Sequence, residues 1–572
     1  MYRFSFCLLL GSLCLLSCQP VPPSHPSEAH QLPFQPHILW LVAEDLSPIL
    51  PMYGDSTAET PNLSRLASEG IVFDQFFSPS GVCAPSRAAI ATGMYPSRIG
   101  AHNMRTLGPP QYMPHGLPSY ECLPPIGTKM HAEYMRELGY YCTNNAKQDY
   151  QFRPTVTAWD ESSRQAHWRN RGPNQPFFAV FNFEVTHESR VWAKAEDSLW
   201  LDPNCEVPVP PYLPDTDIAR RDIRRVYSNI CEMDAQIGAV LDQLEADGLL
   251  DSTIIFWYGD HGGPLPRQKR MMYDSGIQTP LIVRFPDGWR AGTRDGRMTS
   301  FLDLLPTIVS LAGTEPPLHI DGQAFYGPFT KANDREMVFA AADRFDEIVD
   351  MQRAVRTTEM KYIRNFHPDL PMYRPVAYRE QMPVMQELLR LNQEDMLSAD
   401  QALWFRTQRP EEELYDLRTD PHELHNLAED PAYADQLLSL RKACTSWMTE
   451  IGDLGKIPEQ EYVESIWPEG QQPVTSLPRL RPHEGGLTLE ADKGVSKGYV
   501  FLDNEQRVEW ITTREWYGKH ERYAIVTDRD TSEMSWNLMP DHLQIPDGKS
   551  AVFVAHRLGY KPSGLVHSED VE

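Results

Sequence analysis

The hydrophobic residues in the first part of the chain form short runs separated by longer amphipathic stretches. Three runs, His37–Ala43, Phe177–Phe183 and residues 253–258, are apolar almost throughout, which is typical of strands buried on both faces. Residues 280–285 predict a further strand. Residues 217–248 place apolar side chains at three- and four-residue spacings and predict one long helix. This alternation of strands and helices predicts an α/β fold.

Two further patterns complete the expected elements. Thr60, Pro61 and Gly70 have the residue types of an N-cap, a first helical residue and a C′ glycine, so they predict a short helix. Beyond about residue 330 the pattern changes to longer polar helices and loops, up to residue 460. Residues 499–502 and 551–555 belong to short alternating stretches that predict a small all-β module.

These changes of pattern divide the chain into parts. A length of 572 residues exceeds one hydrophobic core, so two or three packed units are expected. The parts are a signal peptide (1–17), a tether (18–34), an α/β domain (35–330), a smaller α+β C-terminal subdomain (331–466), a linker (467–484) and a small β-sandwich module (485–572).

The N-terminus has the pattern of an export signal. Arg3 precedes an apolar run over residues 4–16 that is too short to span a bilayer but suits a signal-peptide core. Residues 15–18 (LLSC) resemble the lipobox of bacterial lipoproteins, in which the cysteine, here Cys18, receives the lipid. We expect an exported lipoprotein at the periplasmic membrane face or the cell surface, in contact with the membrane only through this anchor. The alternative is an ordinary signal peptide with an incidental cysteine.

Charge narrows the choice of partner. Acidic residues outnumber basic residues by 79 to 53, and the net charge is −26. Nucleic-acid binding needs a basic surface that displaces counterions, so the composition argues against a nucleic-acid partner. An anionic substrate would have to be met by a local cluster of positive side chains.

The cysteines give no clear disulfide pattern. Five remain after those at the N-terminus and Cys83 are set aside: Cys122, Cys142, Cys205, Cys231 and Cys444. Export permits disulfides, but an odd number without metal-binding spacing leaves disulfides and free buried thiols equally open.

Metal-capable side chains follow two of the buried strands. Glu44 and Asp45 come directly after His37–Ala43, and Asp260 and His261 follow the strand over residues 253–258. Ligands of open α/β sheets bind outside the carboxyl ends of the strands, so these four side chains are expected to form one site. Three carboxylates suit Ca²⁺, while the histidine leaves Mg²⁺ or Mn²⁺ open.

The segment Cys83-Ala84-Pro85-Ser86-Arg87, followed by Thr92-Gly93, carries a more specific signal. Pro85 fits the first turn of a helix that ends at Gly93, so residue 83 is expected at a helix N-terminus, where the dipole favours an anion. The segment resembles the signature of the type I, formylglycine-dependent sulfatases. The segments NNAKQDY, FEVTHES and GAHNMR most resemble bacterial relatives of the N-sulfoglucosamine sulfohydrolases.

The resemblance implies a fold and a mechanism. It implies an alkaline-phosphatase-like sulfatase domain with a central mixed sheet flanked by helices. Cys83 is then oxidised to formylglycine, whose hydrate attacks sulfur and expels the alcohol before the diol collapses and releases sulfate. A formylglycine-generating enzyme or an anaerobic maturase would perform the oxidation.

The resemblance also implies residue roles. One divalent cation would be held by Glu44, Asp45, Asp260 and His261, with Glu44 a departure from the family's usual Asp. Positive and proton-transferring catalytic groups would be Arg87, Lys147, His187 and Lys269. The family's Gly-Lys-x-His segment is altered, because Asp149 stands in the place of the histidine. His187 is then the first choice for the acid and His115 the second, while Asp149, His102 and Arg105 are expected to contact the sugar.

Three functions remain to be weighed. The first is a sulfatase acting on a sulfated oligo- or polysaccharide, as O-sulfate or N-sulfate. The second is a phosphomonoesterase or phosphodiesterase on the related scaffold, but such enzymes usually have Thr or Ser as nucleophile. The third, a glycan-binding protein without activity, is disfavoured by the intact Cys83, Arg87, Asp45 and Asp260.

Overall fold

The computed structural model describes residues 30, 32–108, 113–114, 116–331, 333–503, 505–515, 518–527, 531–532 and 534–571. The predicted signal peptide, most of the tether with Cys18, and His115 lie outside the described residues. No helix in the described part of the chain is both long enough and apolar enough to cross a membrane.

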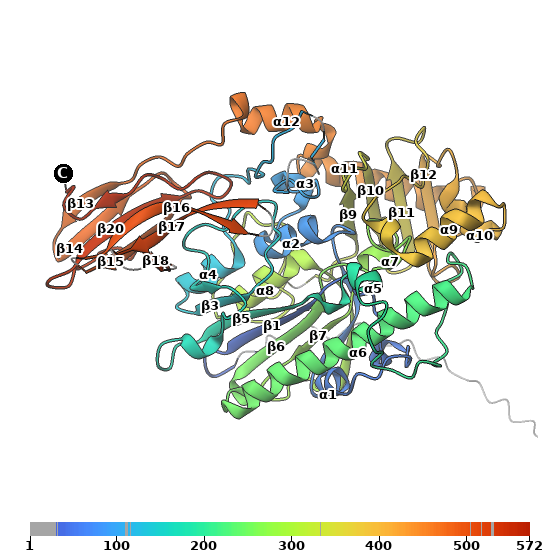
Figure 1. The fold of residues 1–572 in the computed structure, drawn as a ribbon, viewed down its shortest axis with the longest axis horizontal. Coiled ribbons are helices and arrows are strands. Elements are labelled where there is room, and N and C mark those ends of the chain that lie inside the picture. The colour runs from blue at the N-terminus through green and yellow to red at the C-terminus, as the bar shows by residue number, and fades with distance from the viewer. Residues whose placement is uncertain are drawn as a thin grey trace, which may run out of the picture.

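An eight-stranded mixed sheet forms the centre of the largest part of the molecule (Figure 1), with strand order β4-β3-β5-β1-β6-β7-β2-β8. Its strands are β1 (His37–Ala43), β2 (Ile71–Phe77), β3 (Tyr141–Asn145), β4 (Glu161–Ser162), β5 (Phe177–Phe183), β6 (Thr253–Gly259), β7 (Leu281–Arg284) and β8 (Thr293–Ser300). The strands from β4 to β6 run parallel, β7 is antiparallel to β6 and β2, and β2 is parallel to β8. The predicted central mixed sheet is confirmed.

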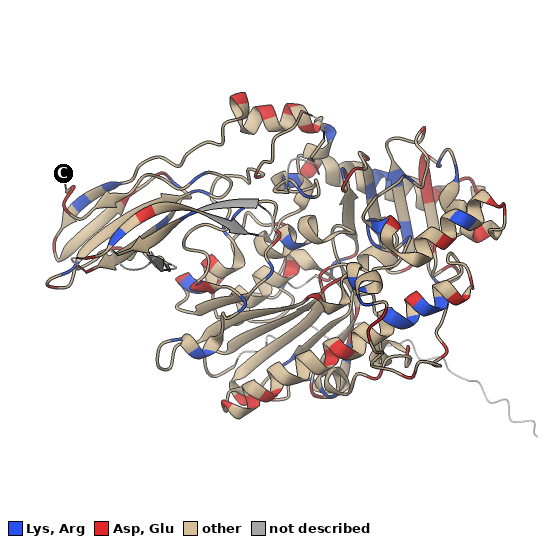
Figure 2. Ribbon diagram, in the orientation of Figure 1, with Lys and Arg blue, Asp and Glu red and all other residues tan. Residues whose placement is uncertain are grey.

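Helices cover both faces of this sheet. On one face, α1 (Pro61–Glu69) and α6 (Asp217–Ala246) pack against Leu39 and Leu41 of β1. On the other, α2 (Cys83–Thr92), α4 (His131–Glu137) and α8 (Leu304–Leu311) pack against Trp40 and Val42. The strands β1, β5 and β6 carry no Lys, Arg, Asp or Glu, so they are tan in Figure 2, whereas α6 has charges along its outer face. Burial on both faces explains these continuous apolar runs.

The predicted C′ role of Gly70 is wrong. α1 does end there, but Gly70 has φ −130°, an extended conformation that any residue adopts. A Cβ at this position would lie 2.8 Å from the carbonyl oxygen of Val283, so the glycine allows β7 to approach closely. Thr60 occupies the N-cap position without a side-chain hydrogen bond.

A second, antiparallel sheet follows, with strand order β12-β11-β10-β9. Its strands are β9 (Val338–Ala342), β10 (Gln352–Arg356), β11 (Met360–Asn365) and β12 (Glu412–Asp416). α11 (Ala434–Glu450) packs on β10 and β11, and α9 (Pro383–Gln393) packs on α6. The remaining helices are α3 (Pro96–Ile99), α5 (Ser189–Ala193), α7 (Asp274–Ile277), α10 (Ala399–Ala402) and α12 (Glu459–Ile466).

Short antiparallel sheets make up the C-terminal part, at the left of Figure 1. The strands are β13 (Arg479–His483), β14 (Gly486–Glu490), β15 (Ser496–Leu502), β16 (Arg507–Glu515), β17 (Gly518–Val526), β18 (Thr531–Ser532), β19 (Asn537–Leu538), β20 (Ser550–His556) and β21 (Val566–His567). The prediction of a linker up to residue 484 is wrong at its end, because β13 pairs there with β14. Arg136 of α4 donates a hydrogen bond of 3.0 Å to the carbonyl of Trp536, which fastens this part to the α/β part.

Candidate active site

The carboxyl ends of β1 and β6 place two acidic pairs side by side. Ala43 and Gly259 are register partners in these parallel strands, so the residues that follow them leave the sheet together. The backbone N–H of Asp45 donates to the Asp260 carboxylate at 3.0 Å. The ends of β1 and β6 therefore meet, as predicted.

Asp45 lies at the centre of a buried charge cluster. Its side chain is fully buried and its φ of 47° turns the chain sharply after β1. Its carboxylate lies 2.9 Å from Nε2 of His261 and accepts hydrogen bonds from Lys269 at 2.9 and 2.7 Å. Burial raises the pKa of Asp45, but Lys269, His187 and His261 outweigh it and hold the pKa well below its usual value.

Cys83 begins α2 and faces this cluster. Its Sγ lies 3.4 Å from Nε2 of His261, and α2 ends as predicted at Gly93, which has φ 66° and donates its N–H to Ala89. Burial raises the pKa of the thiol, but Lys269, Lys147 and His261 together lower it to about 6. The surroundings of residue 83 therefore favour negative charge.

Arg87, one turn further along α2, connects three segments. Its Nε donates to Asp260 at 2.9 Å, and Nη1 donates to the side-chain oxygen of Asn182 at 2.8 Å. Nη2 lies 3.6 Å from the Glu44 carboxylate. Sequence reasoning did not single out Asn182, which lies near the end of β5 among apolar residues, where a single polar residue is the only available signal.

Lys147 and Asp149 lie on the other side of Glu44. The ammonium group of Lys147 forms an ion pair with the Glu44 carboxylate and lies 3.8 Å from that of Asp149. Glu44 therefore already serves two cations, Lys147 and Arg87. Its expected role as a metal ligand beside Asp45 and Asp260 stays a prediction.

His187 enters the site from the turn after β5. Its Nδ1 lies 2.8 Å from the hydroxyl of Ser189, and a ring nitrogen lies within 4.8 Å of a carboxylate oxygen of Asp45 and of Sγ of Cys83. The structure therefore brings His187 to residue 83, which the predicted role of His187 as general acid requires.

Behind the site, a chain of alternating charges extends away from residue 83. Lys269 lies 3.2 Å from Glu188, and Glu188 accepts hydrogen bonds of 2.9 and 2.8 Å from Arg270. Arg270 donates to Asp346 at 2.6 Å, and Asp346 is also paired with Arg105. Glu188 and Arg270 were missed because a charged residue beside a site residue looks in sequence like a solvated surface charge.

Two of the expected sugar contacts differ in their surroundings. Arg105 joins the charge chain and its guanidinium lies 5.3 Å from the centre of the Tyr378 ring. His102 is buried, with its ring 6.1 Å from that of Tyr462 in α12. Burial lowers the pKa of His102, and the charge of Asp343 opposes this shift. The expected contact of His102 with the sugar stays a prediction.

The cysteines left open by the sequence are free. Among the described residues, Cys83, Cys122, Cys142, Cys205, Cys231 and Cys444 form no disulfide. Of these, only Cys83 lies within 4.8 Å of the side chains of Asp260 and His261.

Comparison with known proteins identifies the family. A relative from Formosa agariphila, an ulvan-active sulfatase, is 44% identical over 612 aligned positions, which cover 99% of this chain and 98% of the relative. Residues 36–314 match the family model for sulfatases. This chain belongs to the sulfatase family. It is a sulfuric ester hydrolase, and the predicted membership is confirmed.

Other matches extend over the second part of this sulfatase. Residues 260–387 match the model for the C-terminal part of N-sulphoglucosamine sulphohydrolase. The human N-sulphoglucosamine sulphohydrolase is 25% identical over 462 positions, with 73% of this chain and 90% of the relative covered. A solved structure of a protein with its substrate D-glucosamine-2-N,6-O-disulfate is 18% identical, with a TM-score of 0.54 over 73% of this chain and 99% of that one. The alkaline-phosphatase-like sulfatase fold is thereby confirmed.

The donor atoms of this sulfatase fit a divalent cation. Side-chain atoms of Cys83, Asp260 and His261 lie within 4.8 Å of one another, as do those of Cys83, Asp45 and His187. Asp45 and Asp260 supply hard oxygens and His261 a nitrogen, a donor set that accepts Ca²⁺, Mg²⁺ or Mn²⁺. Nδ1 of His261 is buried without a hydrogen-bond partner.

Proposed function

We propose that this sulfatase releases sulfate from a sulfated glycan and that residue 83, oxidised to formylglycine by a maturation enzyme, supplies the nucleophile. The observation that carries the proposal is the position of Cys83, at the N-terminus of α2 and under the combined positive influence of Lys147, Lys269 and His261. A sulfate group carries the negative charge that this position favours.

The reaction follows from the groups around residue 83. One hydroxyl of the hydrated formylglycine releases its proton to solvent and attacks sulfur, and the bond from sulfur to the sugar oxygen breaks. His187 gives its proton to this oxygen, because its ring nitrogen lies within 4.8 Å of Asp45 and of residue 83 and, unlike His261, it is not assigned to the cation. The second hydroxyl then gives its proton to the now neutral His187, the carbonyl forms again and sulfate leaves, and water hydrates the aldehyde for the next cycle.

The other residues hold charge in position. Lys147 and Lys269 balance the charge on the sulfate, while Arg87 fixes Asp260 and Glu188 fixes Lys269. Asp45, Asp260 and His261 would hold the divalent cation, which when bound supplies Lewis acidity towards a sulfate oxygen. Glu44, the fourth expected ligand, would also position Lys147 and Arg87.

The relatives indicate which glycan to test first. The similar protein from Formosa agariphila is named an ulvan-active sulfatase, and the similarity spans nearly the whole of both chains. We therefore propose ulvan as the substrate of this sulfatase. An N-sulfated glucosamine is the second candidate, because residues 260–387 match the N-sulphoglucosamine sulphohydrolase C-terminal model.

Sulfate release from defined substrates tests the proposal. Protein from a host that can mature Cys83 is incubated with ulvan, N-sulfated heparan fragments and a phosphate monoester, and free sulfate or phosphate is measured. We expect sulfate from ulvan, an aldehyde mass at residue 83, and no release by Cys83→Ala. Cys205→Ala is the matched control, because Cys205 is only partly buried and lies outside the site. Full activity with an unmodified thiol at residue 83 would refute the mechanism.

A further inference from the structure

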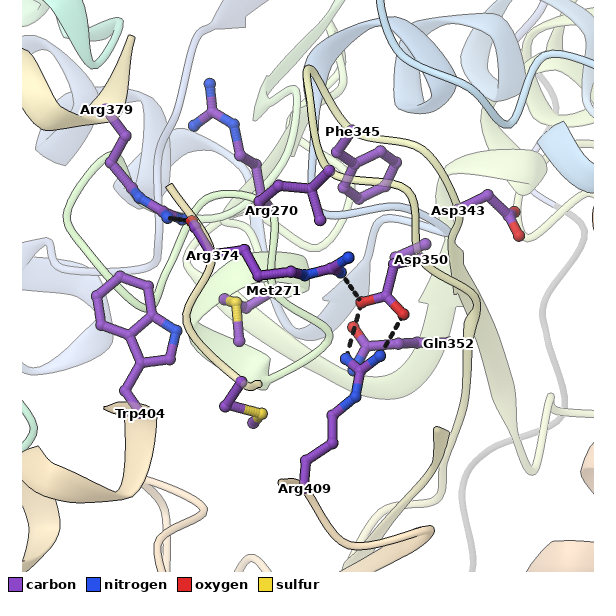
Figure 3. Close-up of a pocket in the computed structure, with 13 residues that line it drawn as sticks. Arg270, Met271, Asp343, Phe345, Asp350, Gln352, Arg374, Arg379, Trp404 and Arg409 are labelled. Atoms are coloured by element: carbon purple, nitrogen blue, oxygen red, sulfur yellow. Dashed lines mark hydrogen bonds and ion pairs between the residues drawn. The ribbon is translucent and has the colours of Figure 1, made fainter. Parts of the chain in front are cut away.

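A small pocket lined by arginines lies beside the active site. It opens between the second sheet and the segments around α9, and Figure 3 shows Arg374, Arg379 and Arg409 directed towards it, with Arg270 at its edge. Trp404 closes one side. A cluster of guanidinium groups around a cavity is typical of sites for carboxylate or sulfate groups.

The arginines are not equally neutralised. Arg270 is held by Glu188 and Asp346, as described above. Arg374 and Arg409 both pair with the carboxylate of Asp350. Arg374 lies 2.8 Å from it, and Arg409 donates two hydrogen bonds to it, of 2.7 and 2.5 Å. Asp343, the other carboxylate that lines the pocket, is paired with Arg353, so two cations on the carboxylate of Asp350 leave an excess positive charge before Arg379 is considered.

Arg379, at the start of the 3₁₀ turn Arg379–Gln381, has no carboxylate partner in the described part of the chain. Arg379 is only 4% exposed. Its Nη2 donates a hydrogen bond of 2.7 Å to the carbonyl of Arg374, and its Nε is buried without a hydrogen-bond partner. Its guanidinium lies 4.9 Å from the Trp404 ring and 5.3 Å from the Tyr373 ring. These aromatic contacts replace only part of the hydration that burial removes.

An uncompensated buried cation is costly. Burial and the neighbouring Arg270 lower the pKa of Arg379 to about 10, so it remains charged at neutral pH. Leaving one charge buried without a partner is strongly destabilising. An anion bound in the pocket would neutralise this charge.

The pocket is adjacent to the reacting centre. Tyr378, the residue before Arg379, has its ring 6.2 Å from that of His187. Arg270 lines the pocket and also binds Glu188, which contacts Lys269. The free volume is about 30 Å³, which holds about two to three oxygen atoms of a charged group but not a sugar ring.

We propose that this pocket binds a second anionic substituent of the glycan, a carboxylate or an additional sulfate, through Arg379 with Arg374 and Arg409. The proposal rests on the proposed function, since it takes the glycan at Cys83 as its source of the anion. Residues of the second sheet would then help the enzyme to select glycans that carry two negative groups.

Direct binding tests the pocket without turnover. The Cys83→Ala protein is titrated with D-glucuronate, inorganic sulfate and D-glucose, and tryptophan fluorescence is followed because Trp404 lines the pocket. We expect a saturable change with glucuronate, with sulfate, or with both, and none with glucose. Arg379→Met should weaken this binding at least 10-fold, whereas Arg390→Met, on the exposed face of α9, should not. If neither anion changes the signal at tens of millimolar, the proposal is wrong.

Stability and kinetics separate binding from a structural role. A ligand-binding Arg379 is a liability in the free protein, so Arg379→Met should leave the melting temperature unchanged or raise it. In the matured enzyme it should raise KM for the glycan at least 10-fold and leave kcat within about twofold. A lower melting temperature with unchanged KM would assign Arg379 to the fold and overturn the proposal. Absence of sulfate release by the wild-type enzyme would instead count against the proposed function.

Discussion

The ammonium group of Lys269 lies 2.9 and 2.7 Å from the two carboxylate oxygens of Asp45. Nε2 of His261 lies 2.9 Å from the same carboxylate, and the two bases neutralise a fully buried acid. In return, Asp260 and Asp45 overcome burial and raise the pKa of His261 to about 10. A divalent cation at Asp45 has to displace this proton and share these oxygens with Lys269, so cation binding and the protonation of His261 are coupled.

Removing the cation or its central ligand should abolish activity. Dialysis against EDTA is expected to stop sulfate release, and adding back Ca²⁺, Mg²⁺ or Mn²⁺ in turn identifies the ion that restores it. Asp45→Asn should lower kcat/KM by a factor of about 10³ and remove any rise in melting temperature caused by the cation, because binding to the folded state alone stabilises it. Asp242→Asn, at an exposed position on α6, is the control. Unchanged activity after exhaustive chelation would contradict the assignment.

The identity of the acid can be tested through the leaving group. His187→Gln should lower kcat on the glycan by about 10²- to 10⁴-fold, the usual contribution of a general acid, because a sugar alkoxide leaves poorly without a proton. On an aryl sulfate, whose phenolate leaves readily, the loss should be much smaller. Asp149→Asn should mainly raise KM on the glycan, since its carboxylate faces Lys147 at 3.8 Å. Equal losses of His187→Gln on both substrates would show that His187 does not protonate the leaving oxygen.

The position of the site was predictable because it depends on strand ends. Buried apolar runs identify β1 and β6, and the acidic pairs after them have to meet once the strands are parallel neighbours. The motif at Cys83 adds the third segment, since a proline in the first turn and a glycine at the end fix the helix. These inferences need only local pattern and the general behaviour of parallel sheets.

The buried charge chain could not be predicted in the same way. Glu188, Arg270 and Asp346 each look like surface residues in sequence, and their pairing depends on how the second sheet packs against the first. Glu44 shows the same limit, because its contacts with Lys147 and Arg87 depend on how three distant segments pack together. Gly70 was assigned to a left-handed cap, although it is required by the close approach of Val283. Long-range packing decides all three.

Arg87 should not tolerate replacement by lysine. Its guanidinium serves Asp260, Asn182 and Glu44 at once, and an ammonium group has neither the planar fork nor the reach to serve three partners. Arg87→Lys should reduce kcat/KM by about 10²-fold or more and lower stability by about 2–4 kcal/mol, because buried carboxylates lose their partner. Arg65→Lys, on the exposed side of α1, is the matched control. Activity and melting temperature close to wild type would mean that the fork is dispensable.

Asp222, far from the chemistry, makes the stability depend on pH. It is buried in α6, where its carboxylate accepts a hydrogen bond of 2.7 Å from the N–H of Val384 at the start of α9, and burial raises its pKa to about 6. The folded state therefore binds a proton between about pH 4 and 6 that the unfolded state has released, so this contribution to stability is present at low pH and is lost as pH rises through 6.

Asp222→Asn keeps an oxygen that can accept the Val384 hydrogen bond and removes the charge. It should raise the unfolding free energy at pH 7.5 by about 1–3 kcal/mol, at 1.36 kcal/mol per pKa unit, and the gain should shrink towards zero at pH 4. Thermal unfolding of both proteins across this range, with Asp242→Asn for comparison, measures the difference. A loss of stability at pH 7.5 that shrinks towards low pH would mean that Arg221, 3.5 Å from the carboxylate, lowers the pKa instead.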